Sequence, residues 1–148
     1  MEIAIISVSD ISNKLAKKAW DILRKHLKRH DLNLAYETTV ESERPFVAGE
    51  ILRCCDERSL DVVLTIGGTG LGTNDIVPEA TQDVCTRDIP GIAAAMRSTS
   101  KPSILSRHVS MQRGTTLVIN LPADSFEMQY CLYQLVRFLP DAVESAHS

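Results

Sequence analysis

The chain has 148 residues, of which 44% are hydrophobic and 24% are charged, and its formal net charge at pH 7 is −3. This size and composition predict one soluble domain over residues 1–148 with a single hydrophobic core. The slightly acidic balance argues against nucleic acid or an anionic membrane as a partner. No apolar run approaches the roughly 20 residues that span a bilayer.

Cysteine and histidine spacing gives no sign of a metal centre. The four cysteines are Cys54, Cys55, Cys85 and Cys131. Without a CxxC pair they fit neither a zinc site nor a disulfide framework, so we predict free thiols in a cytoplasmic protein. We interpret the four histidines as surface or interface residues; they are His26, His30, His108 and His147. Because Met1 leads directly into an apolar run, we expect no signal peptide.

Short apolar runs alternate with segments of helical periodicity along the chain. Continuous β-rich runs predict buried strands over residues 2–9, 33–40, 61–66 and 116–122. Helical spacing predicts helices over residues 13–30, 44–59, 91–99 and 125–139, and a further helix that begins near Pro78. This alternation is typical of a three-layer α/β sandwich, with a mostly parallel sheet and helices on both faces.

Three of these helices carry more detailed predictions. We interpret the basic residues of helix 13–30 as a solvated face rather than a polyanion site. We expect the apolar face of helix 44–59 to point inward, and its members are Phe46, Val47, Ile51, Leu52 and Cys55. Pro140 is expected to bend or interrupt the last helix.

Polar and acidic residues collect in four loops that follow predicted strands. Their sequences are SVSDISN, TVESERP, GGTGLGTND and NLPADSF. In an open parallel sheet, ligands bind beyond the carboxyl ends of the strands. If these loops converge, they therefore form one site.

The loop after the third predicted strand begins with Gly67, Gly68, Thr69 and Gly70. Glycine permits positive φ and leaves the backbone amides bare, and bare amides bind anions. Thr69 would add a hydroxyl donor, and the helix from Pro78 its positive end. The loop thus predicts an oxyanion site, although a tight turn without a ligand has the same composition. Neither GxxxxGK[ST] nor GxGxxG is present.

Asp75 lies beside this predicted anion cradle. A carboxylate next to an anion needs a cation between them, and Mg²⁺ is suited to that position because it binds carboxylates and phosphates together. The alternative is that Asp75 only caps a turn or the start of the helix. We interpret Glu79, in the first helical turn, as a partner of the helix dipole rather than a metal ligand.

The stretch from GGTG through Asp75 to PEA at residues 78–80 resembles the motif GGTG-x-x-x-R-D-x-T-P-E-A of the MoaB/MogA molybdenum cofactor biosynthesis family. The N-terminal domain of gephyrin belongs to this family. The resemblance continues through PGIAAAMR and LSRHVSMQRGTTLVINLP into the last helix. It also includes IAIISVSD at the start, so it covers nearly the whole chain.

The resemblance implies a molybdopterin-binding fold, assembled as a homotrimer or homohexamer. It also implies Mg²⁺-dependent transfer of an adenylyl group from ATP to the phosphate of molybdopterin. Asp75 would be the family's essential acidic residue, catalytic as the ligand that orients Mg²⁺ between the phosphates. The residues implied to bind cofactor are Ser9, Asp10, Gly67, Gly68, Thr69, Gly70, Ser106, Asn120 and Pro122.

Several positions depart from the family pattern. Where the family has a second aspartate, this chain has Ser42 between Glu41 and Glu43, which we predict to be substitute Mg²⁺ ligands. Further departures are Asn74 for arginine, Val77 for threonine, and NLPADSFE for NLPGSPKG. Two cationic groups are lost, which weakens a site for a nucleotide triphosphate.

Three functions therefore stay open. The first is a molybdopterin adenylyltransferase of relaxed sequence. The second is a catalytically degenerate relative that binds pterin or acts as a scaffold. The third is a nucleotide pyrophosphatase, resembling the N-terminal domain of competence/damage-inducible proteins. The PEA and LSR segments favour the cofactor family over the third.

Overall fold

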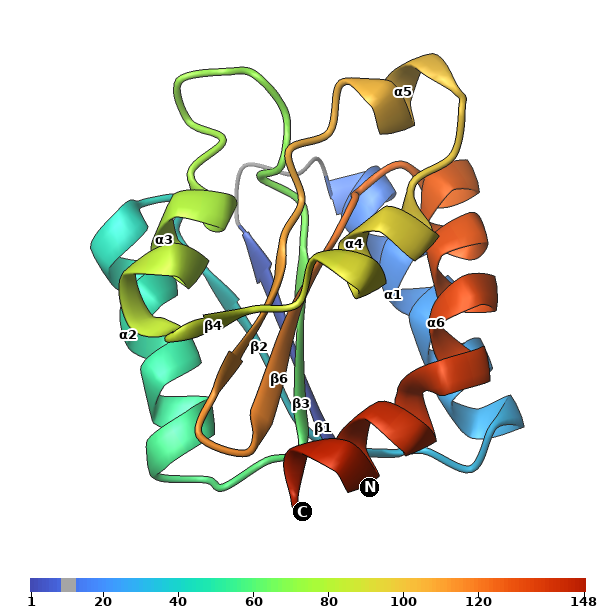
Figure 1. The fold of residues 1–148 in the computed structure, drawn as a ribbon. Coiled ribbons are helices and arrows are strands. Elements are labelled where there is room, and N and C mark those ends of the chain that lie inside the picture. The colour runs from blue at the N-terminus through green and yellow to red at the C-terminus, as the bar shows by residue number, and fades with distance from the viewer. Residues whose placement is uncertain (9–12) are drawn as a thin grey trace.

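The computed structural model describes residues 1–8 and 13–148, which form one sheet with helices on both faces (Figure 1). The strands are β1 Glu2–Val8, β2 Asn33–Val40, β3 Val62–Ile66, β4 Arg87–Asp88, β5 Ser110–Arg113 and β6 Thr116–Leu121. The helices are α1 Asn13–Arg29, α2 Arg44–Asp56, α3 Val77–Val84, α4 Pro90–Met96, α5 Lys101–Ile104 and α6 Ser125–Ala146. None of the helices in this described part is both long and apolar enough to cross a membrane.

The strand order in the sheet is β2-β1-β3-β6-β5-β4. The first four strands in this order are parallel, and β5 runs antiparallel to both β6 and β4. The predicted three-layer, mostly parallel α/β fold is confirmed. The sequence does not predict β4, β5 or α5, because they are four residues long or shorter and lack a continuous apolar run.

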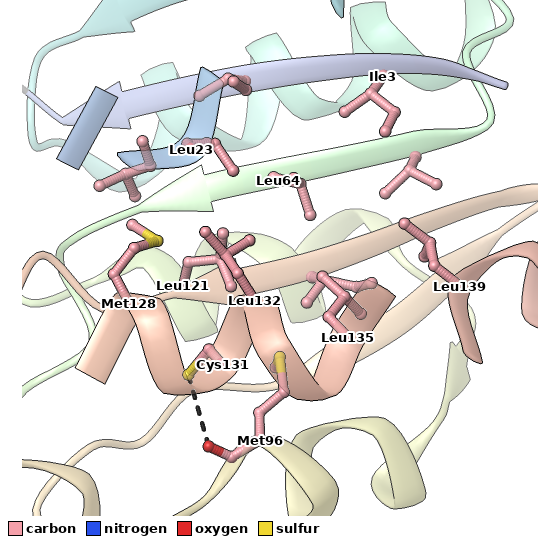
Figure 2. Packing of buried hydrophobic residues seen from close by; sticks show 14 of the residues in the cluster. Ile3, Leu23, Leu64, Met96, Leu121, Met128, Cys131, Leu132, Leu135 and Leu139 are labelled. Atoms are coloured by element: carbon pink, nitrogen blue, oxygen red, sulfur yellow. Dashed lines mark hydrogen bonds between the residues drawn. The ribbon is translucent and has the colours of Figure 1, made fainter. Parts of the chain in front are cut away.

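The core consists of two layers, one on each face of the sheet. Successive residues of a strand point to opposite faces, so Ile3 and Ile5 of β1 pack with α1, α4 and α6, whereas Ala4 and Ile6 pack with α2 and α3. Figure 2 shows side chains of α6, such as Leu132, facing the sheet. Both faces of the central strands are therefore buried, which explains their unbroken apolar sequences.

The prediction of which residues form the inward face of α2 is partly wrong. Val47 and Ile51 are buried as expected, but Phe46 is 51% exposed and Cys54 is fully buried in its place. Positions 47, 51 and 54 follow the i, i+4, i+7 spacing of one helical face, and Phe46 lies about 100° away from it. The basic residues of α1, in contrast, lie on an exposed face as predicted.

Helix α6 continues past the predicted end at residue 139 and contains Pro140, so proline does not interrupt it. Leu139 before the proline is buried, and Ala142 and Val143 after it pack against the same core. Burial on both sides offsets the lost backbone hydrogen bond.

The four cysteines are all free, as predicted. Burial raises the pKa of the Cys54 thiol to about 11 and that of Cys131 to about 12. These thiols stay protonated at neutral pH and are therefore poor nucleophiles.

The two layers predict a contrast between two isoleucines. Ile5 is 0% exposed at the centre of the sheet, whereas Ile104 is 63% exposed on α5. We expect Ile5→Ala to lower the free energy of unfolding by about 2–5 kcal/mol, because it removes buried methyl groups and leaves a cavity. Ile104→Ala should change it by less than about 0.5 kcal/mol. Urea denaturation of both variants measures this difference, and equal losses would contradict the assigned core.

Candidate functional site

A cavity of about 370 Å³ lies at the carboxyl ends of β3 and β6. Three segments enclose it: the glycine loop after β3, the residues of and after α5, and the loop after β6. The lining residues are Gly67, Gly68, Thr69, Gly70, Leu71, Asp75, Pro102, Leu105, Ser106, Pro122, Ala123 and Asp124. A second cavity of about 390 Å³, between β4 and the end of α6, contains none of the residues singled out in the sequence. The convergence of the glycine and NLP loops at the first cavity makes it the candidate site.

The glycine loop begins with two residues whose backbone conformation favours glycine. Gly67 and Gly68 have φ angles of 87° and 67°. A Cβ on Gly68 would lie 2.5 Å from Val77 Cγ2, so a side chain there would collide with α3. The amide of Gly67 donates to the Leu121 carbonyl at 2.9 Å, which extends the pairing of β3 and β6. The loop therefore leaves the sheet in a tight turn against the start of α3.

Three successive amides of this loop are available to a ligand. The N–H groups of Gly68, Thr69 and Gly70 have no hydrogen-bond partner among residues 1–8 and 13–148. All three residues line the cavity. Unpaired amides in a concave loop are suited to bind oxyanions, so the predicted oxyanion site has the donors it needs, and binding itself stays a prediction. Gly70 does not use the positive φ that glycine permits, but a Cβ there would lie 2.8 Å from Asp75 Oδ2.

Asp75 both closes the loop and lines the cavity. Its Oδ2 accepts the Gly72 N–H at 2.9 Å, and its own N–H donates to the Gly72 carbonyl at 3.1 Å. Within the described chain, its Oδ1 has no hydrogen-bond partner. The two interpretations of Asp75 are therefore compatible, because one carboxylate oxygen caps the turn and the other is available to a ligand.

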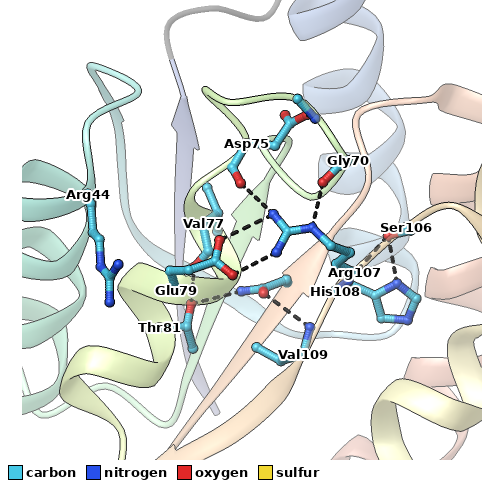
Figure 3. A network of polar contacts seen from close by, with 12 residues as sticks. Arg44, Gly70, Asp75, Val77, Glu79, Thr81, Ser106, Arg107, His108 and Val109 are labelled. Atoms are coloured by element: carbon cyan, nitrogen blue, oxygen red, sulfur yellow. Dashed lines mark hydrogen bonds and ion pairs between the residues drawn. The ribbon is translucent and has the colours of Figure 1, made fainter.

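Arg107 fixes the glycine loop from outside (Figure 3). Its Nε donates to the Gly70 carbonyl at 2.7 Å, and its Nη2 donates to the Asp75 carbonyl at 2.5 Å. Its backbone N–H donates to the Thr69 carbonyl at 2.7 Å. The structure thus shows Arg107 bound to loop carbonyls.

Glu79 completes a clamp, by which we mean the set of hydrogen bonds that Arg107 makes to the glycine loop. Arg107 Nη1 donates to Glu79 Oε2 at 2.6 Å, and this hydrogen bond holds the pKa of Glu79 below its usual value. Glu79 lies in the first turn of α3, so it also faces the positive end of that helix, as predicted. The ion pair joins the glycine loop to α3 and engages the guanidinium that binds the loop.

Asn120 does not line the cavity, contrary to the role that the resemblance implies for it. Its side chain is 0% exposed. Its amide donates to Thr65 Oγ1 at 3.0 Å and to Thr81 Oγ1 at 3.1 Å, and its Oδ1 accepts the Val109 N–H at 3.1 Å. These bonds satisfy the side chain and hold β3, α3 and the residue before β5 together beneath the site. Asn120 therefore supports the site without facing it.

The other predicted residues fall into three groups. Ser106 and Pro122 line the cavity, as implied. Glu41 and Glu43 are exposed and do not line it, although Ser42 between them joins their loop to the glycine loop by donating to the Asn74 carbonyl at 2.8 Å. Their role as Mg²⁺ ligands stays a prediction. Ser9 and Asp10 lie outside the described residues.

The cavity wall carries negative but no positive side chains. Of the lining residues named above, Asp75 and Asp124 are acidic, and none is lysine or arginine. Asp124 Oδ1 accepts the Glu127 N–H at 3.0 Å and so caps α6. In the described part of the chain, no group of three or more His, Cys, Asp or Glu residues could hold a metal by itself. A cation in this cavity would therefore need a bound anion to supply some of its ligands.

A buried histidine lies behind the cavity wall, where the sequence predicts only surface or interface histidines. His108 is 4% exposed, and its Nδ1 is 2.9 Å from Ser106 Oγ. Ser106 Oγ in turn is 3.2 Å from Thr69 Oγ1. A chain of three polar side chains thus leads from the core to the glycine loop, and the sequence gives no spacing signal for it.

The close packing of Gly68 predicts a specific effect of a single methyl group. Gly68→Ala should lower the free energy of unfolding by about 1–3 kcal/mol, because alanine is strained at this φ and collides with Val77. Gly91 in α4 serves as the control, because no atom lies within 4 Å of the position that an added methyl group would take. We expect Gly91→Ala to be neutral or stabilising by up to about 1 kcal/mol. Thermal or urea denaturation compares the stability of the two variants. Equal changes in the free energy of unfolding would contradict the described conformation of the loop.

The pair of Glu79 and Arg107 predicts a pH dependence. The pKa of Glu79 is lower in the folded chain than its ordinary value of 4.5. The unfolded state therefore binds its proton first as the pH falls, and the stabilisation, present above about pH 4.5, is lost below it. Glu79→Gln should cost about 1 kcal/mol at pH 7 and progressively less under acidic conditions. Urea denaturation of wild type and Glu79→Gln between pH 7 and pH 3 measures this cost. A difference in free energy of unfolding that stays constant with pH would contradict the ion pair.

Comparisons with known proteins agree with this architecture. Residues 4–141 match the family described as "Probable molybdopterin binding domain". A molybdopterin adenylyltransferase of Helicobacter pylori is 34% identical over 97% of this chain and 86% of its own length. The crystal structure of the molybdopterin biosynthesis enzyme MoaB from Thermus thermophilus has a TM-score of 0.89 at 30% identity, covering 98% of this chain and 95% of that one. The molybdopterin biosynthesis Mog protein of Mycobacterium ulcerans has a TM-score of 0.84 at 27% identity, covering 99% and 96%. The chain belongs to the MoaB/MogA family of molybdopterin-binding domains.

Proposed function

We propose that this chain binds molybdopterin in the cavity beside the glycine loop and acts in molybdenum cofactor biosynthesis, transferring an adenylyl group from ATP to the molybdopterin phosphate. The observation that carries the proposal is the row of three amides beside the Asp75 carboxylate, those of Gly68, Thr69 and Gly70, which have no partner in the described part of the chain. Membership of the family, and the activity named for the Helicobacter pylori relative, support this reaction.

The three amides suit the phosphate groups of both substrates. Each N–H carries a partial positive charge and is held in place by the clamp on the loop, so it needs little reorganisation to receive an oxyanion. A rigid cradle also loses little entropy when it binds. The amides would position phosphate oxygens, and the hydroxyl of Thr69 would add an orienting hydrogen bond from the same wall.

Asp75 fits the role of a Mg²⁺ ligand. Its available Oδ1 supplies one carboxylate oxygen, and Mg²⁺ in phosphoryl-transfer sites takes one or two carboxylates together with substrate phosphates. Glu41 or Glu43 would supply a second carboxylate if their loop closes toward the cavity. When bound, the metal would supply the positive charge that the lining side chains lack.

The proposed transfer needs positioning more than acid–base chemistry. An oxygen of the molybdopterin phosphate forms a bond to the α-phosphorus of ATP, and the bond from that phosphorus to its bridging oxygen breaks. Pyrophosphate then leaves with the electron pair. Both reacting groups are ionised at neutral pH, so no side chain has to remove a proton. The chain would hold them in line, which is a large part of the rate gain in such reactions.

A second function has an observation of its own. The lining residues include two carboxylates and no cationic side chain, and Arg107 is already bound to Glu79 and to loop carbonyls. Such a wall favours a ligand with one phosphate over a triphosphate. The second candidate is therefore a protein that binds molybdopterin without transferring AMP. From the family resemblance alone, we also propose a cytoplasmic homotrimer or homohexamer, which light scattering would test.

Asp75→Asn separates the proposed roles of the carboxylate from those of the amides. We expect pyrophosphate release from MgATP and molybdopterin to fall by about 100-fold or more, because the charge that holds the metal is lost. Molybdopterin binding should change little, since the amides remain. Asp141→Asn, an exposed carboxylate on α6, is the matched control and should keep the wild-type rate.

The wild-type result distinguishes the two candidates. Molybdopterin binding with pyrophosphate release supports the transferase, and binding without release supports the second candidate. A wild-type protein that does not bind molybdopterin at all would contradict both.

A further inference from the structure

One wall of the cavity has no anchor in the hydrophobic core. This α5 wall comprises residues 98–105, and it contributes Pro102 and Leu105 to the cavity lining. No residue of the α5 wall belongs to either core layer, and Ile104 and Leu105 are 63% and 44% exposed. In Figure 1, α5 lies beyond the end of the sheet, on the same side as the loop between β3 and α3. Hydrogen bonds therefore decide how firmly this wall is held between its two ends.

Most hydrogen bonds of the α5 wall stay within its own segment, residues 97–106. Arg97 Nη1 donates to the Ser103 carbonyl at 3.0 Å, and the Ser98 N–H donates to Ser103 Oγ at 2.7 Å. The Ser100 hydroxyl caps α5 by accepting the Ser103 N–H at 3.3 Å. These bonds shape the wall, but they do not join it to the rest of the molecule.

Glu127 makes the bonds that do. It is 2% exposed and lies in the first turn of α6. Ser100 Oγ donates to its Oε1, and Ser98 Oγ lies 3.1 Å from its Oε2. Ser98 Oγ is equally close to Ser100 Oγ, but a charged carboxylate is the stronger acceptor. In the described part of the chain, no other residue outside the 97–106 segment shares a hydrogen bond with the α5 wall.

The same turn of α6 also borders the cavity. Asp124 lines the cavity and accepts the Glu127 N–H at 3.0 Å, so the backbone of Glu127 is fixed to the end of the loop after β6. From there the side chain of Glu127 reaches the α5 wall. Glu127 thereby links two of the three segments that enclose the cavity.

The burial of Glu127 makes this link costly to break. Among residues 1–8 and 13–148, no Lys, Arg or His forms an ion pair with it. Its charge is met instead by the two serine hydroxyls and by the positive end of α6. A buried carboxylate that loses its hydrogen bonds keeps an unpaired charge, which is strongly unfavourable. The carboxylate therefore holds both hydroxyls in place.

We propose that Glu127 is a positioning residue of the candidate site: its buried carboxylate tethers the α5 wall to α6 and so holds Pro102 and Leu105 at the cavity. The ligand-binding part of this inference rests on the proposed function. A wall that is already held in position loses less conformational entropy when a ligand binds than a wall that the ligand has to order. The tether would therefore raise affinity without touching the ligand.

Backbone hydrogen exchange tests the tether without a ligand. Glu127→Met keeps the length of the side chain and suits a buried position, but its thioether cannot replace the two carboxylate oxygens as an acceptor. Glu127→Gln keeps one oxygen for one serine and can donate to the other. We expect the amides of the α5 wall to exchange about tenfold faster in Glu127→Met and within about threefold of wild type in Glu127→Gln. Unchanged exchange in Glu127→Met would overturn the tether.

Molybdopterin binding then tests the positioning role. We expect Glu127→Met to bind about tenfold more weakly than wild type, and Glu127→Gln to bind within about threefold of it. Glu50→Met is the matched control, because Glu50 is 5% exposed in α2, on the other face of the sheet, and accepts hydrogen bonds from Tyr36 and Arg53. This control loses a buried carboxylate too, but it should keep wild-type affinity and wild-type exchange in the α5 wall.

The outcomes separate this inference from the proposed function. If wild type binds molybdopterin and Glu127→Met binds it equally well, or loses no more affinity than Glu50→Met, Glu127 is only structural and the inference is overturned. If wild type binds no molybdopterin, the proposed function fails, and the role of Glu127 toward a ligand fails with it. Hydrogen exchange still decides on its own whether Glu127 tethers the α5 wall.

Discussion

The site depends on a glycine loop that is held open from outside instead of being closed by its own hydrogen bonds. Gly68 lies so close to Val77 that a side chain has no room, and Arg107 binds the carbonyls of Thr69, Gly70 and Asp75. Three carbonyls of the loop are thereby satisfied, while three of its amides have no partner among the described residues. This asymmetry gives the loop a positive surface toward the cavity without any cationic side chain.

The same arrangement explains the charge balance of the site. The guanidinium of Arg107 is bound to the loop carbonyls and to Glu79. Its positive charge therefore stabilises the loop and is not directed at the ligand. Asp75 and Asp124 then add negative charge at the wall. An oxyanion would bind such a wall well only if a cation accompanied it, and this is the physical reason to pair the amides with Mg²⁺ at Asp75.

Local patterns predict the fold and the place of the site, but not the contacts between distant segments. Apolar runs identify the four parallel strands, and GGTG identifies the loop that lines the cavity. Arg107 reaches Gly70 across 37 residues, and Asn120 reaches Thr65 across 55, so no local spacing reveals that one is a clamp and the other a buried support. His108 is similarly hidden, because its burial depends on how α4 packs over the sheet.

The most direct test of the account is an amide NMR titration of the wild-type protein with molybdopterin. The amides of Gly68, Thr69 and Gly70 should shift strongly as the ligand binds, because they have no partner among the described residues and belong to residues that line the cavity. Those of Gly67 and Gly72 should shift much less, because they already donate to Leu121 and Asp75. Equal shifts across all five amides, or none, would contradict an oxyanion cradle at the exit of β3.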